Sequence, residues 1–428
     1  MNTEPHAALF RRHLRQAGNI TPASSAATGK AVKWTLVGLV CLTTCLPCLR
    51  AVDPEIDLDL EQCRIATLHE GKLHVLAPQR GHRWTEWGMI ARLEDGRWLW
   101  LPEALKGGVT CLHSWRGQLL VGGATGSTHD DRERALRVWN GDAWEAAFGL
   151  DEAARLDGRI ELMAGTDHDD LTVAGKGLRI GPGKPIRVAR WNGRAWKALG
   201  QGPPVRTDAS LKSLVVAPNG MTYLLVEEFH PTRRWVLWHW AETVGWRALP
   251  GGQQKNHLAV TSDGELYVAG RFFPPLVSTH CLIARWDGKR WHELAGRLTH
   301  PGGPEPGSSV SIEVSALGTW RNQLVVGGGF RQSGEVTANL IALWDGHSWT
   351  NLGEGLGGTS MWHLDGKQGP LYFEDHYPAL LPSDEDALYA IGRLDRAGTV
   401  AVRGLARWNG KDWDNPLAGP ASETRVNP

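Results

Sequence analysis

The residues best suited to chemistry lie together in one long insertion, residues 353–378. It contains the stretches MWHLDG and LYFEDHYP, which place two histidines, two carboxylates and a tyrosine on a single loop: His363, Glu374, Asp375, His376 and Tyr377. Imidazole and carboxylate groups in one place can bind a transition metal, or share a proton transfer as acid and base. We take these five residues as candidate ligand-binding residues.

The order of these residues matches no established metal motif. The chain contains no HExxH pattern, so we predict no metal site, no cofactor and no catalytic residue. A long connecting loop that buries its own aromatic side chains accounts for the same residues and is the preferred interpretation. The acidic stretch Asp167-His168-Asp169-Asp170 lacks the EF-hand pattern, and we interpret it as a polar turn.

A short sequence motif that ends in Trp is repeated seven times after Asp53, and we expect it to form the scaffold that positions these loops. Typical copies are LRVWNGDAW, VARWNGRAW and IALWDGHSW, and the second Trp is present in all seven: Trp98, Trp144, Trp196, Trp246, Trp291, Trp349 and Trp413. Asn-Gly or Asp-Gly between apolar residues is a strong signal for a β-hairpin, because both residue types tolerate positive φ. A four-residue connection would place the two tryptophans opposite each other, and a two-residue turn would make them diagonal neighbours; in either case they lie close enough to pack.

A second hairpin precedes each block, as in CLHSWRGQLLVGG at Cys111 and LAVTSDGELYVAG at Leu258. Each unit therefore contains four strands. The first Trp position recurs every 46 to 64 residues, at Leu93, Trp139, Trp191, Trp240, Trp286, Trp344 and Trp408. Four strands repeated seven times at this spacing predict an all-β fold, a seven-bladed β-propeller.

The order of glycines and tryptophans resembles the kelch repeat. Gly122-Gly123 followed by Trp139 and Trp144 shows this order, as does Gly327-Gly328 followed by Trp344 and Trp349. The chain departs from kelch by having Trp rather than Tyr on the third strand, and in the length of its last turn. It is closer in style to the exported bacterial proteins built from WNGxxW units. The resemblance implies blade-building residues and carries no catalytic residue with it.

The kelch-like order also predicts how the ring closes. The first strand of each unit would be innermost, with blade 1 starting near Gln62 and blade 7 ending near Leu417. Each blade would then come from one contiguous segment. The alternating stretch EIDLDL at Glu55 leaves a second option, in which it adds an outer strand to the last blade.

We divide the chain into a basic and apolar N-terminal region (residues 1–52), the propeller (53–420) and a C-terminal tail (421–428). The apolar run 34–49 follows several basic residues and is shorter than the roughly 20 residues of a comfortable membrane span. A cleaved export signal is the first interpretation and a membrane anchor the second; a lipoprotein signal with Cys45 acylated is the third. All three place the propeller outside the cytoplasm: periplasmic, extracellular or membrane-anchored and facing outward.

Ligands of propellers usually bind the face that carries the connections between blades and between second and third strands. Several of these loops carry Arg, including Arg271, Arg331 and Arg393. Such a rim can attract an anionic glycan or a carboxylate, although a solvated face in a neutral protein accounts for the same residues. We take these three arginines as further candidate ligand-binding residues.

Composition excludes some functions. The 428 residues carry a formal net charge of zero, which argues against a nucleic-acid partner. Cys63 and Cys111 fall in adjacent blades, where a disulfide or two buried thiols would fit. The first functional hypothesis is a non-enzymatic module that binds a protein or glycan. The alternative is an enzyme acting on a glycan or similar polymer at the channel mouth.

Overall fold

A computed structural model describes most of the chain after Asp57. The described residues are 58–60, 63, 65–77, 87–102, 105–106, 108–125, 134–151, 153–165, 170–230, 232–250, 253–272, 283–299, 314–357 and 378–418. The chain divides into two units between Pro54 and Glu55, and all described residues belong to the second. The predicted N-terminal segment 34–49 lies outside them. No helix among the described residues is long and apolar enough to cross a membrane.

Seven four-stranded antiparallel blades make up this unit. Blade 1 contains β1 (Ala66–His69), β2 (Lys72–Ala77), β3 (Trp87–Glu94) and β4 (Arg97–Trp100). Blade 2 contains β6 (Gly108–Trp115), β7 (Gln118–Thr125), β8 (Arg134–Trp139) and β9 (Trp144–Ala146). Blade 3 contains β10 (Leu156–Ala164), β11 (Leu171–Ile180), β12 (Ile186–Trp191) and β13 (Trp196–Ala198). Blade 4 contains β14 (Ser210–Val216), β15 (Thr222–Glu228), β16 (Arg234–Ala241) and β17 (Gly245–Ala248).

The remaining three blades repeat the plan. Blade 5 contains β18 (Gln253–Val260), β19 (Leu266–Phe272), β20 (Ile283–Trp286) and β21 (Trp291–Glu293). Blade 6 contains β23 (Val314–Trp320), β24 (Gln323–Gly328), β27 (Ile341–Trp344) and β28 (Trp349–Thr350). Blade 7 contains β30 (Pro378–Leu380), β31 (Leu388–Gly392), β34 (Leu405–Trp408) and β35 (Trp413–Asp414). The seven-bladed propeller predicted from the repeat is confirmed.

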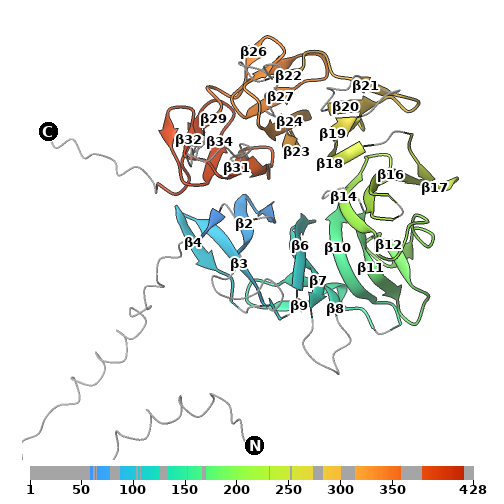
Figure 1. The fold of residues 1–428 in the computed structure, drawn as a ribbon. Coiled ribbons are helices and arrows are strands. Elements are labelled where there is room, and N and C mark those ends of the chain that lie inside the picture. Colours follow the sequence, from blue (N-terminus) through green and yellow to red (C-terminus); the bar gives the residue numbers. More distant parts are fainter. Residues whose placement is uncertain are drawn as a thin grey trace, which may run out of the picture. The chain divides into compact units, whose positions relative to one another are not determined.

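The blades follow one another around a ring in chain order (Figure 1). The first strands of consecutive blades contact each other, from β1 and β6 through to β23 and β30. The first strand of each blade is therefore the innermost. Because strands alternate in direction, the connections between second and third strands and those between blades share one face, called here the loop face. The WNGxxW turns lie on the opposite face.

The turn chemistry explains why the repeated block forms a hairpin. In blade 2, the side-chain oxygen of Asn140 accepts hydrogen bonds from the backbone N–H groups of Asp142 and Ala143, both at 2.9 Å. The following Gly141 has φ 108°, a conformation that favours glycine. The hairpin then sets Trp139 directly opposite Trp144, with ring centroids 5.2 Å apart. Of the two arrangements that the sequence leaves open, the structure has the one in which the tryptophans face each other.

Glycine closes the second strand where the backbone of the first strand comes too close for a side chain. The register between β10 and β11 shifts at two places. At Gly175, a Cβ atom would lie 2.0 Å from the carbonyl oxygen of Arg159. At Gly123, a Cβ would lie 2.1 Å from the carbonyl oxygen of Gly108. The recurring glycine therefore follows from bulges in the innermost strands.

The apolar core is divided among the joints between blades. Seven clusters of buried residues each draw on two neighbouring blades, so that every joint of the ring has its own cluster. The cluster between blades 7 and 1 contains Leu60, Cys63 and Val75 together with Tyr389 and Ile391. Burial of apolar area at these joints is the main term that holds a propeller closed.

The ring closes through side-chain packing. Among the described residues, no strand of blade 7 pairs with a strand of blade 1, and β35 pairs with β34 alone. Each blade is contiguous, as predicted. Residues 55–57 of the EIDLDL stretch lie outside the described residues. Leu60, the last residue of that stretch, is buried against Gly404, whose Cβ, if present, would lie 3.0 Å from that of Leu60.

Short extra strands connect neighbouring blades on the loop face. β5 (Leu105–Lys106) pairs with the start of β3. β22 (Leu298–Thr299), β25 (Gln332–Ser333) and β26 (Val336–Thr337) form a three-stranded sheet between blades 5 and 6. β29 (Leu356–Gly357), β32 (Arg396–Ala397) and β33 (Val400–Ala401) form an equivalent sheet between blades 6 and 7. We call these two sheets the clasps, because each joins a loop of one blade to the end of the preceding blade.

Candidate functional site

The candidate residues taken from the sequence fall into two groups. His363, Glu374, Asp375, His376 and Tyr377 lie outside the described residues, so their role as ligand-binding residues stays a prediction. Arg271, Arg331 and Arg393 have described backbones on the loop face. Arg271 lies on β19 opposite Gln254 of β18, and its side chain lies outside the described part of the structure.

Arg331 and Arg393 lie beside the clasps. The backbone N–H of Arg331 donates to the carbonyl of Thr299 at 2.9 Å, and its carbonyl accepts from Ala338 at 2.8 Å. Arg393 directly precedes Leu394, whose carbonyl accepts from Gly404. The backbones of the two segments that carry these arginines join neighbouring blades, which leaves less of them free to adapt to a ligand.

In the described part of the loop face, the loop between β15 and β16 of blade 4 brings together several charged side chains that form ion pairs. We define the blade-4 rim as Lys212, Glu227, Glu228, Phe229, His230, Arg233 and Arg234. Glu227 and Glu228 end β15, and Arg234 begins β16 directly opposite Glu228. The side chains of the two glutamates are only 1% and 5% exposed, which is unusual for carboxylates at the end of a strand.

Each buried carboxylate of the rim has a cationic partner. One oxygen of Glu227 accepts from Lys212 Nζ at 2.7 Å, and the other is hydrogen-bonded to Arg233 Nε. Arg234 Nε donates to Glu228 Oε2 at 2.6 Å. Burial raises the pKa of Glu227, but the hydrogen bonds from Lys212 and Arg233 outweigh it and hold the pKa below its usual range. Glu227 is therefore ionised at neutral pH and acts as a fixed anion.

The outer layer of the rim is exposed and mixed in character. The Arg233 guanidinium lies 4.9 Å from the ring centroid of buried Trp235, a cation–π contact. Phe229 at the tip of the loop is 40% exposed, which is high for a large apolar side chain. Arg233 and Arg234 are each more than 60% exposed. An exposed aromatic ring flanked by two arginines can bind an apolar surface and an anion together.

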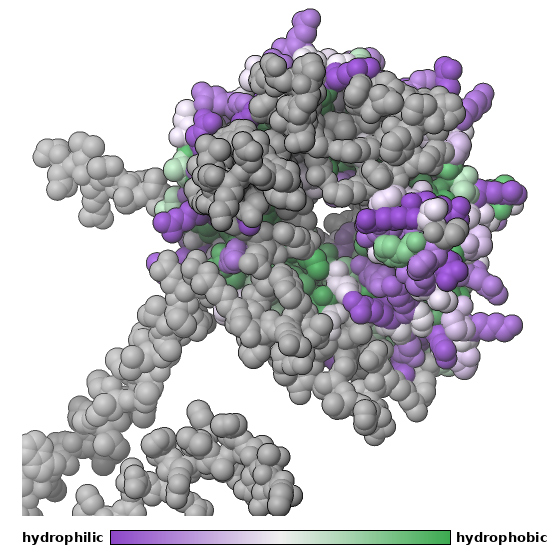
Figure 2. Space-filling model, in the orientation of Figure 1, coloured by the Kyte–Doolittle hydropathy of each residue, from purple (hydrophilic) through white to green (hydrophobic). Residues whose placement is uncertain are grey.

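Blade 3 extends this positive surface. Lys176, Arg179 and Lys184 are exposed along the β11–β12 connection. Lys176 Nζ lies 3.7 Å from Glu161 Oε1, a weak ion pair on the inner strand β10. Figure 2 shows hydrophilic residues gathered beside the central opening, over the part of the ring that blade 4 forms. Exposed cations of the described loop face therefore lie on both blade 3 and blade 4.

No family model matches the chain, and no curated protein matches it. Solved structures share the propeller architecture. The propeller domain of the trilobed protease from Pyrococcus furiosus is 9% identical over 84% of this chain and 99% of its own, with a TM-score of 0.44. A puromycin-hydrolysing peptidase of Mycobacterium tuberculosis is 12% identical over 85% of this chain, with a TM-score of 0.45, and this chain spans 55% of its length.

A third similar structure is the lectin SapL1 in complex with α-methyl fucoside. It is 16% identical over 68% of this chain and 96% of its own, with a TM-score of 0.32. At these identities the likeness concerns the fold alone.

Other reactive groups among the described residues are structural. No set of three or more His, Cys, Asp or Glu side chains in this part of the chain could hold a metal ion. Cys63 and Cys111 are buried and are not joined to each other by a disulfide, and burial raises the pKa of Cys111 to about 12. A thiol with so high a pKa is a poor nucleophile.

Glu227 and Glu228 were not among the candidate residues taken from the sequence. The sequence contains a signal for them. The motif VEEF ends an apolar strand, and charged residues at such a position need partners. The partner Lys212 comes from the neighbouring strand β14, and this pairing is not visible in a local pattern.

Proposed function

We propose that this protein is a non-enzymatic binding module that recognises an anionic partner through the blade-4 rim. The observation that carries the proposal is the pairing of Glu227 with Lys212 and Arg233. A carboxylate held ionised by two cations is poorly suited to proton transfer, whereas it can fix the position of Arg233. A pre-positioned arginine beside exposed Phe229 and Arg234 loses little side-chain entropy on binding.

The chemistry of the rim favours a polymer that carries carboxylates, such as an acidic glycan. Arg233 and Arg234 supply forked donors that match a carboxylate. Phe229 offers an apolar face for a sugar ring, and the exposed cations of blade 3 extend the positive surface. An enzyme that cleaves such a polymer is the alternative, since it would use the same rim to hold its substrate.

The test is binding of polygalacturonate to the full-length protein by surface plasmon resonance, with neutral dextran as the control polymer. We expect saturable binding that weakens as salt rises, and no binding of dextran. Replacing both rim arginines (Arg233→Ala with Arg234→Ala) should weaken binding about tenfold. The matched control is Arg194→Ala with Arg290→Ala, because these two exposed arginines lie in WNGxxW turns on the opposite face.

The outcomes separate the two functions. Binding without release of reducing ends supports the binding module. Release of reducing ends would favour the enzyme. Equal loss in both double variants, or no binding at all, would contradict a role for the rim.

We also propose that the propeller is exported, through a signal or an anchor in residues 34–49. The support is the basic flank followed by an apolar run in that segment. Fusing residues 1–53 to a reporter that is active only outside the cytoplasm tests this. An inactive reporter in cells that make the fusion would contradict it.

A further inference from the structure

Phe148 occupies a position that glycine holds in other blades. It is the fourth residue after the second Trp of blade 2, and the matching residues of blades 3 and 6 are Gly200 and Gly353. All three have positive φ: 65° at Phe148, 60° at Gly200 and 57° at Gly353. This conformation suits glycine, and it is strained for a bulky aromatic residue.

At the two glycines, the first Trp of the next blade fills the space above the backbone. A Cβ at Gly200 would lie 3.2 Å from Cζ3 of Trp240, and one at Gly353 would lie 3.3 Å from Cζ3 of Trp408. In blade 2 the ring of Phe148 stacks instead on Trp191, the first Trp of blade 3. The two ring centroids are 4.4 Å apart and the planes differ by 2°. Strained residues that persist in a fold often mark a functional site.

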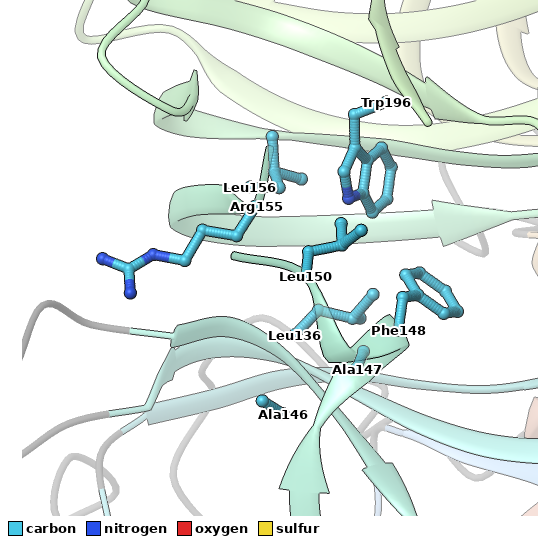
Figure 3. Close-up of a pocket in the computed structure, with 8 residues that line it drawn as sticks. All are labelled: Leu136, Ala146, Ala147, Phe148, Leu150, Arg155, Leu156 and Trp196. Atoms are coloured by element: carbon cyan, nitrogen blue, oxygen red, sulfur yellow. The ribbon is translucent and has the colours of Figure 1, made fainter. Parts of the chain in front are cut away.

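A cavity opens beside this stack, between blades 2 and 3 (Figure 3). Its volume is about 80 Å³. It is lined almost entirely by apolar side chains: Leu136, Ala146, Ala147, Phe148, Leu150, Leu156 and Trp196, with Arg155 at one end. An engineered cavity of about 150 Å³ holds benzene, so this one has room for roughly an isopropyl group.

Trp196 brings an indole N–H that solvent can reach to the cavity wall. In blades 4 to 7, the indole N–H of the second Trp donates to a backbone carbonyl of the preceding blade, as Trp246 does to Leu199 at 2.7 Å. Trp196 makes no such bond with any residue that the structure describes, although it is only 8% exposed. Trp98 and Trp144 also lack the bond, but only Trp196 lines the cavity.

The side chains of the wall thus offer the indole N–H of Trp196 as an uncharged donor, beside polar lining surface that Arg155 and backbone atoms supply. Figure 3 shows the nitrogen of Trp196 on the side of the ring that faces Leu150. It also shows the guanidinium of Arg155 extending away from Phe148 and Trp196. Arg155 Nε donates a hydrogen bond to Asp157 Oδ1 at 2.8 Å. A charged ligand atom beside the indole would therefore be desolvated without a counter-ion, whereas a neutral carbonyl would be matched.

We propose that this cavity is a binding site for a small branched aliphatic group that carries a neutral carbonyl. The branched carbons fill the space enclosed by the leucines and Phe148, and the carbonyl oxygen accepts from Trp196 Nε1. This site is separate from the blade-4 rim, so either proposal can fail without the other.

The test is a ligand-observed NMR titration of the full-length protein with isobutyramide, which combines an isopropyl group with a neutral carbonyl. Two probes serve as controls. Adamantane-1-carboxamide has the same carbonyl but is too large for the cavity. Isobutylamine at neutral pH has the branched chain but carries a positive charge and no acceptor. We expect saturable binding of isobutyramide and none of the other two.

Three variants test whether isobutyramide binds in this cavity. Trp196→Phe keeps an aromatic ring but removes the donor, and should weaken binding about three- to tenfold. Phe148→Gly restores the residue found in other blades, removes a wall of the cavity and should weaken binding more than Trp196→Phe does. Trp100→Phe changes an exposed Trp outside the cavity and should leave binding unchanged.

The proposal is overturned if isobutyramide shows no saturation in the tens of millimolar range, or if adamantane-1-carboxamide binds equally well. It is also overturned if Trp196→Phe binds as tightly as the original protein. Should Phe148→Gly fail to fold, Trp196→Phe and the size control still decide the matter.

Discussion

The indole N–H of Trp413 donates to the backbone carbonyl of Leu352 in the preceding blade, at 2.7 Å. Equivalent bonds join blades 3 to 4, 4 to 5 and 5 to 6. The second Trp of the repeat therefore has two roles in these blades. Its ring packs on the first Trp within the hairpin, and its nitrogen connects the hairpin to the neighbouring blade.

Trp413→Phe should lower the free energy of unfolding more than Trp98→Phe does. Both tryptophans are buried, but within the described residues Trp98 makes no bond to a neighbouring blade. The two variants lose similar ring area, so the difference isolates the hydrogen bond, worth about 1 kcal/mol. Denaturant unfolding of both variants measures it. Equal losses would show that the bond adds nothing to ring packing.

Gly353→Ala should destabilise the protein more than Gly71→Ala. Both glycines have positive φ, 57° and 69°, so each alanine bears the strain of a left-handed backbone, about 1 kcal/mol. A Cβ at Gly71 meets nothing within 4 Å, whereas one at Gly353 meets the ring of Trp408 at 3.3 Å. We expect a lower melting temperature for Gly353→Ala than for Gly71→Ala. The reverse order would mean that the joint between blades 6 and 7 adapts freely.

Acid should destabilise the protein partly through His74. Burial lowers the pKa of His74 from 6.5 to about 4, and its Nδ1 is hydrogen-bonded to the carbonyl of Lys72 at 3.0 Å. Between pH 6.5 and 4, the imidazole of His74 therefore binds a proton in the unfolded chain but stays neutral in the folded chain. Stability falls as the pH drops through this window, by about 3 kcal/mol for this residue.

His74→Asn removes this titration and keeps a side-chain donor near Lys72. The slope of unfolding free energy against pH should flatten between pH 6.5 and 4 in this variant. Chemical denaturation at a series of pH values measures the slope. An unchanged slope would assign the acid sensitivity to other groups.

Glu227→Gln should cost about 2 kcal/mol of stability, because it leaves Lys212 and Arg233 beside a neutral group in a partly buried site. The control Glu242→Gln breaks the exposed pair with Lys197 and should change stability by less than about 1 kcal/mol. Because the pKa of Glu227 is depressed, its contribution is present above the pKa of an unfolded carboxyl and is lost as the pH falls below it.

The ring was predictable from the sequence because its signals are local. The Asn or Asp of each WNGxxW turn caps the turn with its own side chain, and the glycine supplies positive φ, so a nine-residue pattern specifies a hairpin. Five such hairpins, with a two-residue Asp95-Gly96 turn in blade 1 and a turn ending at Gly245 in blade 4, define the seven blades.

The clasps were missed because their pairing is not local. β25 and β26 have two residues each, and β25 pairs with Leu298 and Thr299 across more than thirty positions. No periodicity marks so short a strand. Phe148 was missed for a different reason. Phe148 is unusual only when it is compared with Gly200 and Gly353, which follow the second Trp of their blades at the same spacing. That comparison is meaningful only once the left-handed backbone of these two glycines is known.

The contiguity of each blade has an evolutionary consequence. In a ring closed by one blade shared between both ends of the chain, each terminal segment supplies only part of that blade, so duplicating a terminal segment adds an incomplete blade. Here the joint between blades 7 and 1 is a patch of side chains around Leu60 and Ile391, and each blade carries all four of its strands in sequence. A tandem duplication of one unit would add a complete blade and leave the terminal ones whole. The ring can thus change size through a single genetic event, with only the curvature of its joints left to adjust.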